Sequence, residues 1–306
     1  MIIQPPPQGT CHGFEILSHI AHSTLTEGVG SPVTVSEIAS RDKPVGDLIL
    51  SFDERQGRLP MTIHSRAPGR YEVATTSLGI FEVDTIQSTI GVPRTSEMVR
   101  REMLTLGTPL ALLIEHYEDL ALHAAGLAPD SKAVLITGTG GAGKSTLTAA
   151  ALARGWRVLG DDLLRVRVHA TVSAFQGPAV ARVRQPAMGF LELSRVKEVS
   201  RVAGKVLLVP RPFPRYVSTA VEVGAVVIIG GHPTVLSLTE VEPRDAIPQL
   251  WKQSFYLPTD SSRESCFALL ASLVSSVPVM RLAYPHTPDA LQPALDLLAG
   301  SLQSHA

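Results

Sequence analysis

Residues 133–162 read AVLITGTGGAGKSTLTAAALARGWRVLGDD, and this stretch decides the fold. The positions that fit the phosphate-binding pattern G-x-x-x-x-G-K-[ST] are Gly138, Gly143, Lys144 and Ser145. The apolar run at residues 133–137 has the length and branching of a buried strand. We expect a helix over residues 145–154, ended by Gly155. A strand, a glycine-rich loop and a helix in this order are the context that the pattern requires.

The residue types in this loop suit the binding of a nucleoside triphosphate. Glycines tolerate positive φ and carry no Cβ, so backbone N–H groups can converge on phosphate oxygens. The helix N-terminus adds about half a positive charge. We expect Lys144 to bridge the β- and γ-phosphates of ATP, and the Ser145 hydroxyl to bind Mg²⁺. The predicted nucleotide-binding residues are Gly138, Thr139, Gly140, Gly141, Ala142, Gly143, Lys144, Ser145 and Thr146.

A dinucleotide site is the competing interpretation of the same glycines. Gly138, Gly140 and Gly143 also spell G-x-G-x-x-G, and Asp161 would then bind the ribose. A chain with 24 glycines contains that shorter pattern by chance far more often than the full loop with its Lys-Ser pair. The triphosphate interpretation is therefore favoured.

Two aspartates follow the loop after only one helix and one short strand. The strand is expected at residues 156–159, and Gly160 precedes Asp161 and Asp162. The strand next to the loop strand is therefore expected to carry them. Neighbouring side chains of a regular strand point to opposite faces, so both acids can reach one site only where the strand ends and turns. Gly160 permits such a turn.

The residues before the loop add a histidine to this arrangement. Residues 120–128 read as a strand and residues 129–131 as a turn, which predicts a hairpin that holds His123 near the phosphate site. A histidine-bearing strand, a turn, a phosphate loop and an Asp-Asp pair resemble the catalytic half of HPr kinase/phosphorylase and of smaller HPr-kinase-like proteins. The resemblance covers residues 120–166 clearly, is weaker beyond them and is absent before them. Shikimate and gluconate kinases also have an acidic pair after the second strand, but their phosphate loop opens the chain.

The resemblance implies an α/β fold, with a P-loop kinase core of the HPr kinase/PEP carboxykinase-like type preceded by a β-rich domain. It implies transfer of the γ-phosphoryl group of ATP, with Mg²⁺, to a hydroxyl of a peptide or small protein, most simply a serine. HPr-kinase-like proteins include enzymes that tailor peptides in biosynthetic pathways. The HPr enzyme forms hexamers, so a homo-oligomer is a further expectation. The alternatives are a nucleotide-binding regulatory protein without transfer activity and a small-metabolite kinase.

Residue roles follow from the same resemblance. His123 corresponds to the active-site histidine, Asp161 to the base for the acceptor hydroxyl, and Asp162, together with Ser145, to a metal ligand. A lysine of the family in a similar apolar run makes Lys205 a catalytic candidate. From the residues alone, His123 can equally be a hydrogen-bonded histidine on a half-buried strand, and Asp161 a turn acid or helix cap.

One departure from the family concerns the segment after the acidic pair. Residues 182–192 keep an arginine and one glycine of the signature of the bifunctional HPr enzyme but lack its opening glutamate. Neither phosphorylase activity nor HPr as the acceptor is therefore expected. Arg182 and Arg184 lie two apart on one face of a strand, where they could clamp a phosphoryl group or face solvent. Residues 193–216, which include Arg201, are the most basic and irregular part of the chain and are expected to form a lid.

Composition sets broader limits on function. The chain has 306 residues, a formal net charge of −1 and 44% hydrophobic residues, which argues for a soluble protein and against nucleic acid or a membrane as partner. Cys11 and Cys266 fit no metal or redox spacing, and no run of 18 apolar residues occurs, so the cytoplasm is the expected location.

The remaining pattern predicts three regions: a β-rich domain at residues 1–95, a helical junction at 96–119 and the catalytic domain at 120–306. The first domain is expected to be a small antiparallel sheet that recognises the acceptor, after a loose proline-rich arm at residues 1–9. Its strands are expected at 14–20, 33–38, 47–52, 61–64, 71–76 and 80–86. Beyond the acids we expect strands at 163–169, 171–175, 180–184, 223–230, 234–238 and 277–282, with a turn at 231–233 pairing the fourth and fifth. Helices are expected at 96–106, 109–116, 243–250, 262–275 and 288–298.

Overall fold

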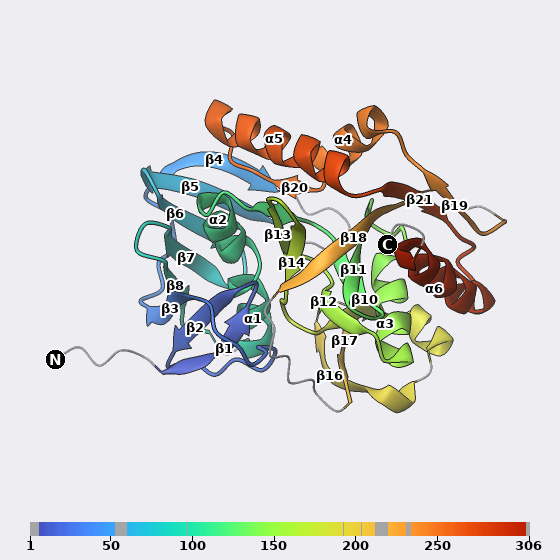
Figure 1. Ribbon diagram of the computed structural model, residues 1–306. Helices are drawn as coiled ribbons and strands as arrows, with labels where there is room; N and C mark the ends of the chain where they lie inside the picture. The colour runs from blue at the N-terminus through green and yellow to red at the C-terminus, as the bar shows by residue number, and fades with distance from the viewer. Residues whose placement is uncertain are drawn as a thin grey trace.

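The structure is a computed structural model that describes residues 6–52, 60–95, 97–191, 193–202, 204–211, 220–230 and 234–303. It is a mixed α/β protein with two large sheets and one small sheet, which Figure 1 shows with the first sheet on the left and the second on the right. In the part of the chain so described, no helix is both long and apolar enough to span a membrane.

The first sheet contains eight strands in the order β1-β2-β3-β8-β7-β6-β5-β4. Their bounds are β1 Pro7–Cys11, β2 Phe14–Ser18, β3 Ser31–Ile38, β4 Asp47–Phe52, β5 Met61–Ala67, β6 Arg70–Thr75, β7 Gly79–Asp84 and β8 Thr89–Pro93. In β2, buried and half-buried residues alternate, as expected for a strand with one face on a core. Helices α1 (Met98–Thr105) and α2 (Thr108–His116) pack on that core.

The expectation of a small antiparallel sheet was wrong in its pairing and in its number of strands. The sheet is mixed, because β3 pairs in parallel with both β2 and β8. It also contains two strands that were not expected, β8 and β1. β1 lies partly in the segment expected to be a loose arm, and Pro7 is tolerated there because β1 is an edge strand. Residues 1–5 of that arm lie outside the described residues.

The second sheet contains ten strands, in the order β12-β10-β11-β18-β14-β13-β9-β20, with β21 paired to β18 and β19 paired to β21. Their bounds are β9 Leu120–Leu122, β10 Ala125–Ala128, β11 Lys132–Gly138, β12 Arg157–Gly160, β13 Leu164–Val168, β14 Val172–Phe175, β18 Ala220–Ile229, β19 Ser237–Glu240, β20 Ser254–Phe255 and β21 Val279–Ala283. β18 pairs in parallel with both β11 and β21.

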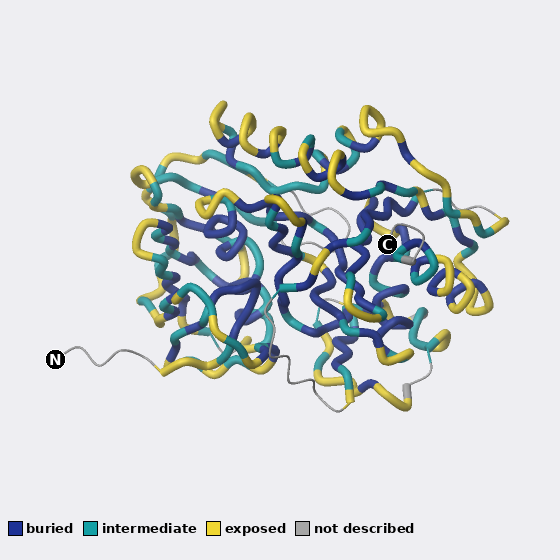
Figure 2. Tube along the Cα trace, in the orientation of Figure 1, coloured by how far each residue is buried: buried dark blue, intermediate teal, exposed yellow. Residues whose placement is uncertain are grey.

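Helices cover both faces of the second sheet. The helices α3 (Lys144–Arg154) and α6 (Pro288–Gln303) pack on one face, and α4 (Pro243–Trp251) and α5 (Asp260–Ser276) pack on the other. Successive residues of β11 alternate between these two cores, which explains why its sequence is continuously apolar. In Figure 2, most of this sheet is buried, whereas α5 has exposed stretches along its outer side.

The expectation of an irregular lid was wrong, because most of that segment belongs to a third sheet. It contains β15 (Ala181–Arg184), β17 (Lys205–Pro210) and β16 (Val196–Val202), in that order. The segment looked irregular because β16 is an edge strand and exposes its charges, whereas β17 buries the apolar run at residues 206–209. The 3₁₀ turns η1 (Gln185–Phe190) and η2 (Leu193–Arg195) lie between β15 and β16 in the chain. Of the expected lid, residues 203 and 212–219 lie outside the described residues.

Three expectations about pairing also change. The strand expected over residues 120–128 breaks at residues 123–124, because β9 pairs with β13 and β20, whereas β10 pairs with β11 and β12. β12 is separated from the loop strand by β10 and does not lie next to it. β19 pairs with β21 and not with β18, and the turn at 231–233 lies outside the described residues.

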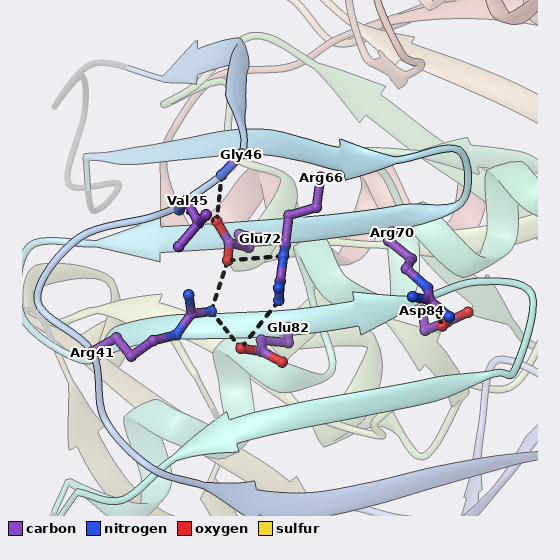
Figure 3. Close-up of polar contacts among 8 residues, drawn as sticks. All are labelled: Arg41, Val45, Gly46, Arg66, Arg70, Glu72, Glu82 and Asp84. Atoms are coloured by element: carbon purple, nitrogen blue, oxygen red, sulfur yellow. Dashed lines mark hydrogen bonds and ion pairs between the residues drawn. The ribbon is translucent and has the colours of Figure 1, made fainter.

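A buried carboxylate fastens the loop before β4 to the first sheet (Figure 3). Glu72 accepts hydrogen bonds from the backbone N–H groups of Val45 and Gly46, at 2.7 and 3.1 Å, and from Arg41 at 2.7 Å. Arg41 also contacts Glu82. Burial opposes ionisation of Glu72, but the two N–H groups and the guanidinium outweigh it and lower its pKa.

A buried arginine joins the two large sheets. Arg165, on β13, is 1% exposed. Its Nε donates to Asp119 Oδ2 at 2.6 Å, and its Nη1 donates to the His12 carbonyl oxygen at 3.2 Å. Its guanidinium carbon lies 4.4, 4.6 and 5.2 Å from the ring centroids of Phe14, Phe175 and Tyr117. The cation therefore contacts residues from both sheets and from the junction between them.

Candidate functional site

The glycine-rich loop joins β11 to α3, so the strand, loop and helix expected from the sequence are present. Gly138, Gly141 and Gly143 have φ values of 146°, 85° and 99°, a region that residues with a Cβ rarely adopt. A Cβ on Gly143 would lie 2.0 Å from the hydroxyl oxygen of Tyr284. That hydroxyl donates to the Gly143 carbonyl oxygen at 3.2 Å. The loop conformation therefore requires glycine at residue 143.

Lys144 begins α3 and is buried, with 7% of its surface exposed. Its ammonium group donates to the carbonyl oxygens of Gly138 and Thr139 at 2.6 and 3.3 Å. The cation therefore lies inside the loop, among backbone groups of the same loop.

Asp161 follows β12 and is 7% exposed. Its Oδ2 accepts a hydrogen bond from the Arg182 backbone N–H at 2.7 Å. Its Oδ1 is buried without a hydrogen bond from any residue that the structure describes. Burial raises the pKa of Asp161, although the Arg182 N–H, the Arg182 guanidinium and the Ser145 hydroxyl act in the opposite direction. A carboxyl group with a raised pKa and a free oxygen can accept a proton.

Asp162 and His123 form a pair beside this carboxylate. His123 Nδ1 lies 2.8 Å from the backbone oxygen of Asp162 and 3.1 Å from its Oδ1. The backbone N–H of His123 donates to the backbone oxygen of Gln253 at 2.6 Å. The backbone oxygen of His123 accepts a hydrogen bond from the Thr137 hydroxyl at 3.1 Å. The break between β9 and β10 thus holds the histidine from both sides and directs Nδ1 to Asp162.

Arg182 connects the two acids. Its backbone N–H binds Asp161, and its Nη1 lies 2.7 Å from Asp162 Oδ2. The side chain is only 18% exposed, so it does not belong to a solvated strand face. Arg184, two residues later on β15, is exposed. The two arginines expected to act alike therefore have different surroundings.

These groups line one cavity of about 690 Å³, a size typical of small-molecule and cofactor sites. It brings together His123, Asp161, Asp162, Arg182, Arg184, Lys205 and residues 140–146. Of the predicted site residues, Gly138 and Thr139 are not among those that line it. Their roles, and those of the other predicted residues, stay predictions.

The cavity carries more positive than negative charge. Among its described lining residues, the cations are Arg100, Lys144, Arg182, Arg184, Lys205 and Lys252, and the acids are Asp161 and Asp162. This excess suits a polyanionic ligand. The described residues form no cluster of three or more His, Cys, Asp or Glu side chains able to hold a metal. Mg²⁺ commonly uses one or two carboxylates together with substrate phosphates, so the oxygens of Ser145 and the two acids fit that ion.

Several lining residues escaped the sequence interpretation. Tyr284 and His286 follow β21, and their ring centroids lie 5.1 Å apart beside Gly143. Burial raises the pKa of Tyr284, so its hydroxyl stays a donor to the loop. Gln253, which follows α4, accepts the hydrogen bond from the backbone N–H of His123, and Lys252 also lines the cavity. None of these residues belongs to a motif, and only the fold brings them to the loop.

No protein-family model and no curated protein matches the chain. Among solved structures, the chain is similar to an HPr(Ser) kinase/phosphatase from Coxiella burnetii, with 15% identity and a TM-score of 0.33. The match covers 61% of this chain and 99% of that chain. Any relationship at this level is distant, and the function of the chain is therefore inferred from the residues around the cavity.

Proposed function

We propose that the chain is an ATP-dependent phosphotransferase, with a P-loop core, that phosphorylates a hydroxyl of a peptide or small protein, most simply a serine. The observation that carries the proposal is the buried Asp161, which lines the same cavity as the glycine-rich loop and whose Oδ1 has no hydrogen bond from the described residues. A peptide-tailoring role in a biosynthetic pathway is part of the proposal.

In the proposed reaction, the loop N–H groups and Lys144 bind the phosphates of ATP. Ser145 and Asp162 would hold Mg²⁺, which would supply charge neutralisation. The acceptor oxygen forms a bond to the γ-phosphorus while the bond to the β–γ bridging oxygen breaks and ADP leaves. The acceptor proton passes to Asp161 Oδ1, and His123 orients the neighbouring Asp162 through its contact at 3.1 Å.

The test is transfer of labelled γ-phosphate from Mg-ATP to HPr, precursor-like peptides and free serine. Lys144→Ala and Asp161→Ala are expected to lower transfer by about 100-fold or more. Matched controls are Lys132→Ala, on the same β11 strand, and Asp130→Ala, in the exposed turn before it; both should keep wild-type rates. Wild type that binds ATP but shows neither transfer nor Asp161-dependent hydrolysis would favour a regulatory protein.

The Mg²⁺ dependence of the rate tests which of the two acids binds the metal and which accepts the proton. If Asp162 holds Mg²⁺ and Asp161 accepts the proton, Asp162→Asn raises the Mg²⁺ concentration needed for half-maximal rate, while Asp161→Asn lowers the maximal rate at any Mg²⁺ concentration. The opposite result would exchange the two roles.

A specific observation favours a second candidate, a small-metabolite kinase. Arg182, Arg184 and Lys205 line the cavity together with Asp162, as a compact basic acceptor pocket requires. Transfer to free serine in preference to every peptide would support this candidate.

A further inference from the structure

The cavity continues past the acids to one face of α1 and α2. Its lining includes Arg100, Met103 and Leu104 of α1 and Gly107, which lies between α1 and α2. Met103 and Leu104 lie three and four positions after Arg100, so these three side chains share one face of α1. Thr108 and Ala111 continue this line on α2. The side chains at 103 and 104 make the middle of that face apolar.

A second part of the lining belongs to the edge of the first sheet. Phe52 on β4 and Met61 on β5 are direct cross-strand partners, and both line the cavity. The Met61 sulfur lies 3.3 Å from the Thr108 hydroxyl oxygen, which brings this edge against α2. Both apolar side chains are only partly buried in the core of the first sheet, and their remaining surface is available to the cavity.

Two more apolar residues connect this region to the reacting groups. Leu163 directly follows Asp162, and Phe255 on β20 pairs with Ala121, two residues before His123. Both line the cavity and are partly buried. We name the region formed by Phe52, Met61, Met103, Leu104, Leu163 and Phe255 the apolar chamber. It begins within one residue of the acid pair.

The chamber lies on the acceptor side of the site. A triphosphate in the loop places its terminal phosphate near Lys144 and Ser145. Tyr284 and His286 also line the cavity and contact the loop at Gly143, so in this inference the remainder of the nucleotide lies beside them. The volume beyond the acids is left for the molecule that carries the hydroxyl.

We infer that the acceptor is a peptide in which apolar side chains flank the phosphorylated hydroxyl, and that these side chains occupy the apolar chamber. This inference rests on the proposed function. Peptides with charged or very small residues beside the serine gain no burial there. Burying one large apolar side chain corresponds to about 10-fold to 100-fold in affinity.

The experiment compares Ac-Leu-Ser-Leu-NH₂, Ac-Gly-Ser-Gly-NH₂ and Ac-Gln-Ser-Gln-NH₂ as acceptors. We expect KM for the Leu peptide to be at least about 10-fold lower than for the other two. Met103→Gln should remove most of that preference and leave KM for ATP unchanged. The matched control is Met98→Gln, an exposed position of the same helix that does not line the cavity.

Two outcomes would overturn the inference, and one further measurement separates it from the proposed function. Equal KM values for the three peptides would overturn the inference. A raised KM for ATP in Met103→Gln, with the peptide preference intact, would also overturn it, because the chamber would then hold the nucleotide base. If wild type transfers no phosphate, calorimetric binding of the three peptides to wild type and Met103→Gln decides the inference separately from the proposed function.

Discussion

The buried Arg165 gives the most direct stability prediction, and Arg165→Met is the change that tests it. The guanidinium is 1% exposed, contacts Asp119 at 2.6 Å and lies against three aromatic rings. Methionine keeps much of the side-chain volume but removes the charge and its hydrogen bonds. The substitution therefore tests whether the ionic and ring contacts, and not volume alone, hold the two sheets together.

The expected loss in the free energy of unfolding is the sum of destabilising and compensating contributions. Breaking a buried ion pair costs about 3–5 kcal/mol, and a desolvated cation on a ring contributes roughly a further 0.5–2 kcal/mol. Arg167 lies 3.0 Å from Asp119 Oδ2 and keeps that carboxylate paired, and methionine regains apolar burial. We expect a net loss of about 3 kcal/mol in the free energy of unfolding.

Arg167→Met is the matched control, because Arg167 binds the same carboxylate but its side chain is 39% exposed. A half-exposed ion pair contributes at most about 1 kcal/mol. Urea denaturation followed by fluorescence and circular dichroism should show a much larger decrease for Arg165→Met than for Arg167→Met. Equal decreases, or a loss below about 1 kcal/mol for Arg165→Met, would refute the reasoning.

Three further predictions concern the loop and two carboxylates. Gly143→Ala should reduce the affinity for ATP by more than about 100-fold in calorimetry, because the added Cβ meets Tyr284. Gly141→Ala has open space around it and should lower the free energy of unfolding by only about 1–2 kcal/mol, through backbone strain. Glu72→Gln should lose about 3 kcal/mol at pH 7. Because the pKa of Glu72 is lowered, this difference should shrink in acid melts as pH falls below the ordinary value of about 4.3. Asp161→Asn should abolish transfer yet gain about 1 kcal/mol at pH 7, and since burial raises the pKa of Asp161, the gain should vanish in melts below about pH 4.

The elements that the sequence predicted well are those with strong local signals. The apolar run before the loop, the glycines and the helix ended by Gly155 all appear within a residue or two of the expected places. The first-domain strands with alternating residues, such as β6 and β7, were also found. Periodicity and glycine chemistry act over a few residues, so the chain itself contains them.

The misses share a different cause, since each depends on partners far away in the chain. The break at His123 exists because β9 and β10 have different neighbours, and no residue between them is a turn former. The contact between Tyr284 and Gly143 likewise joins residues that are far apart in the chain. Arg182 was placed on a strand correctly, but its contact with both acids depends on how the third sheet packs against β12.

The buried carboxylate of the site differs in its hydrogen bonding from the other buried carboxylates. The buried carboxylates that the structure describes are Glu72, Glu102, Asp119 and Asp161. Glu102 accepts four hydrogen bonds from Ser23 and Thr24, and Glu72 and Asp119 are likewise paired with N–H groups and arginines. Of these four, only Asp161 keeps an oxygen without a hydrogen bond. A fold that satisfies its other buried acids leaves this one incomplete beside the glycine-rich loop, and such a cost to stability is expected where a proton or a ligand has to bind.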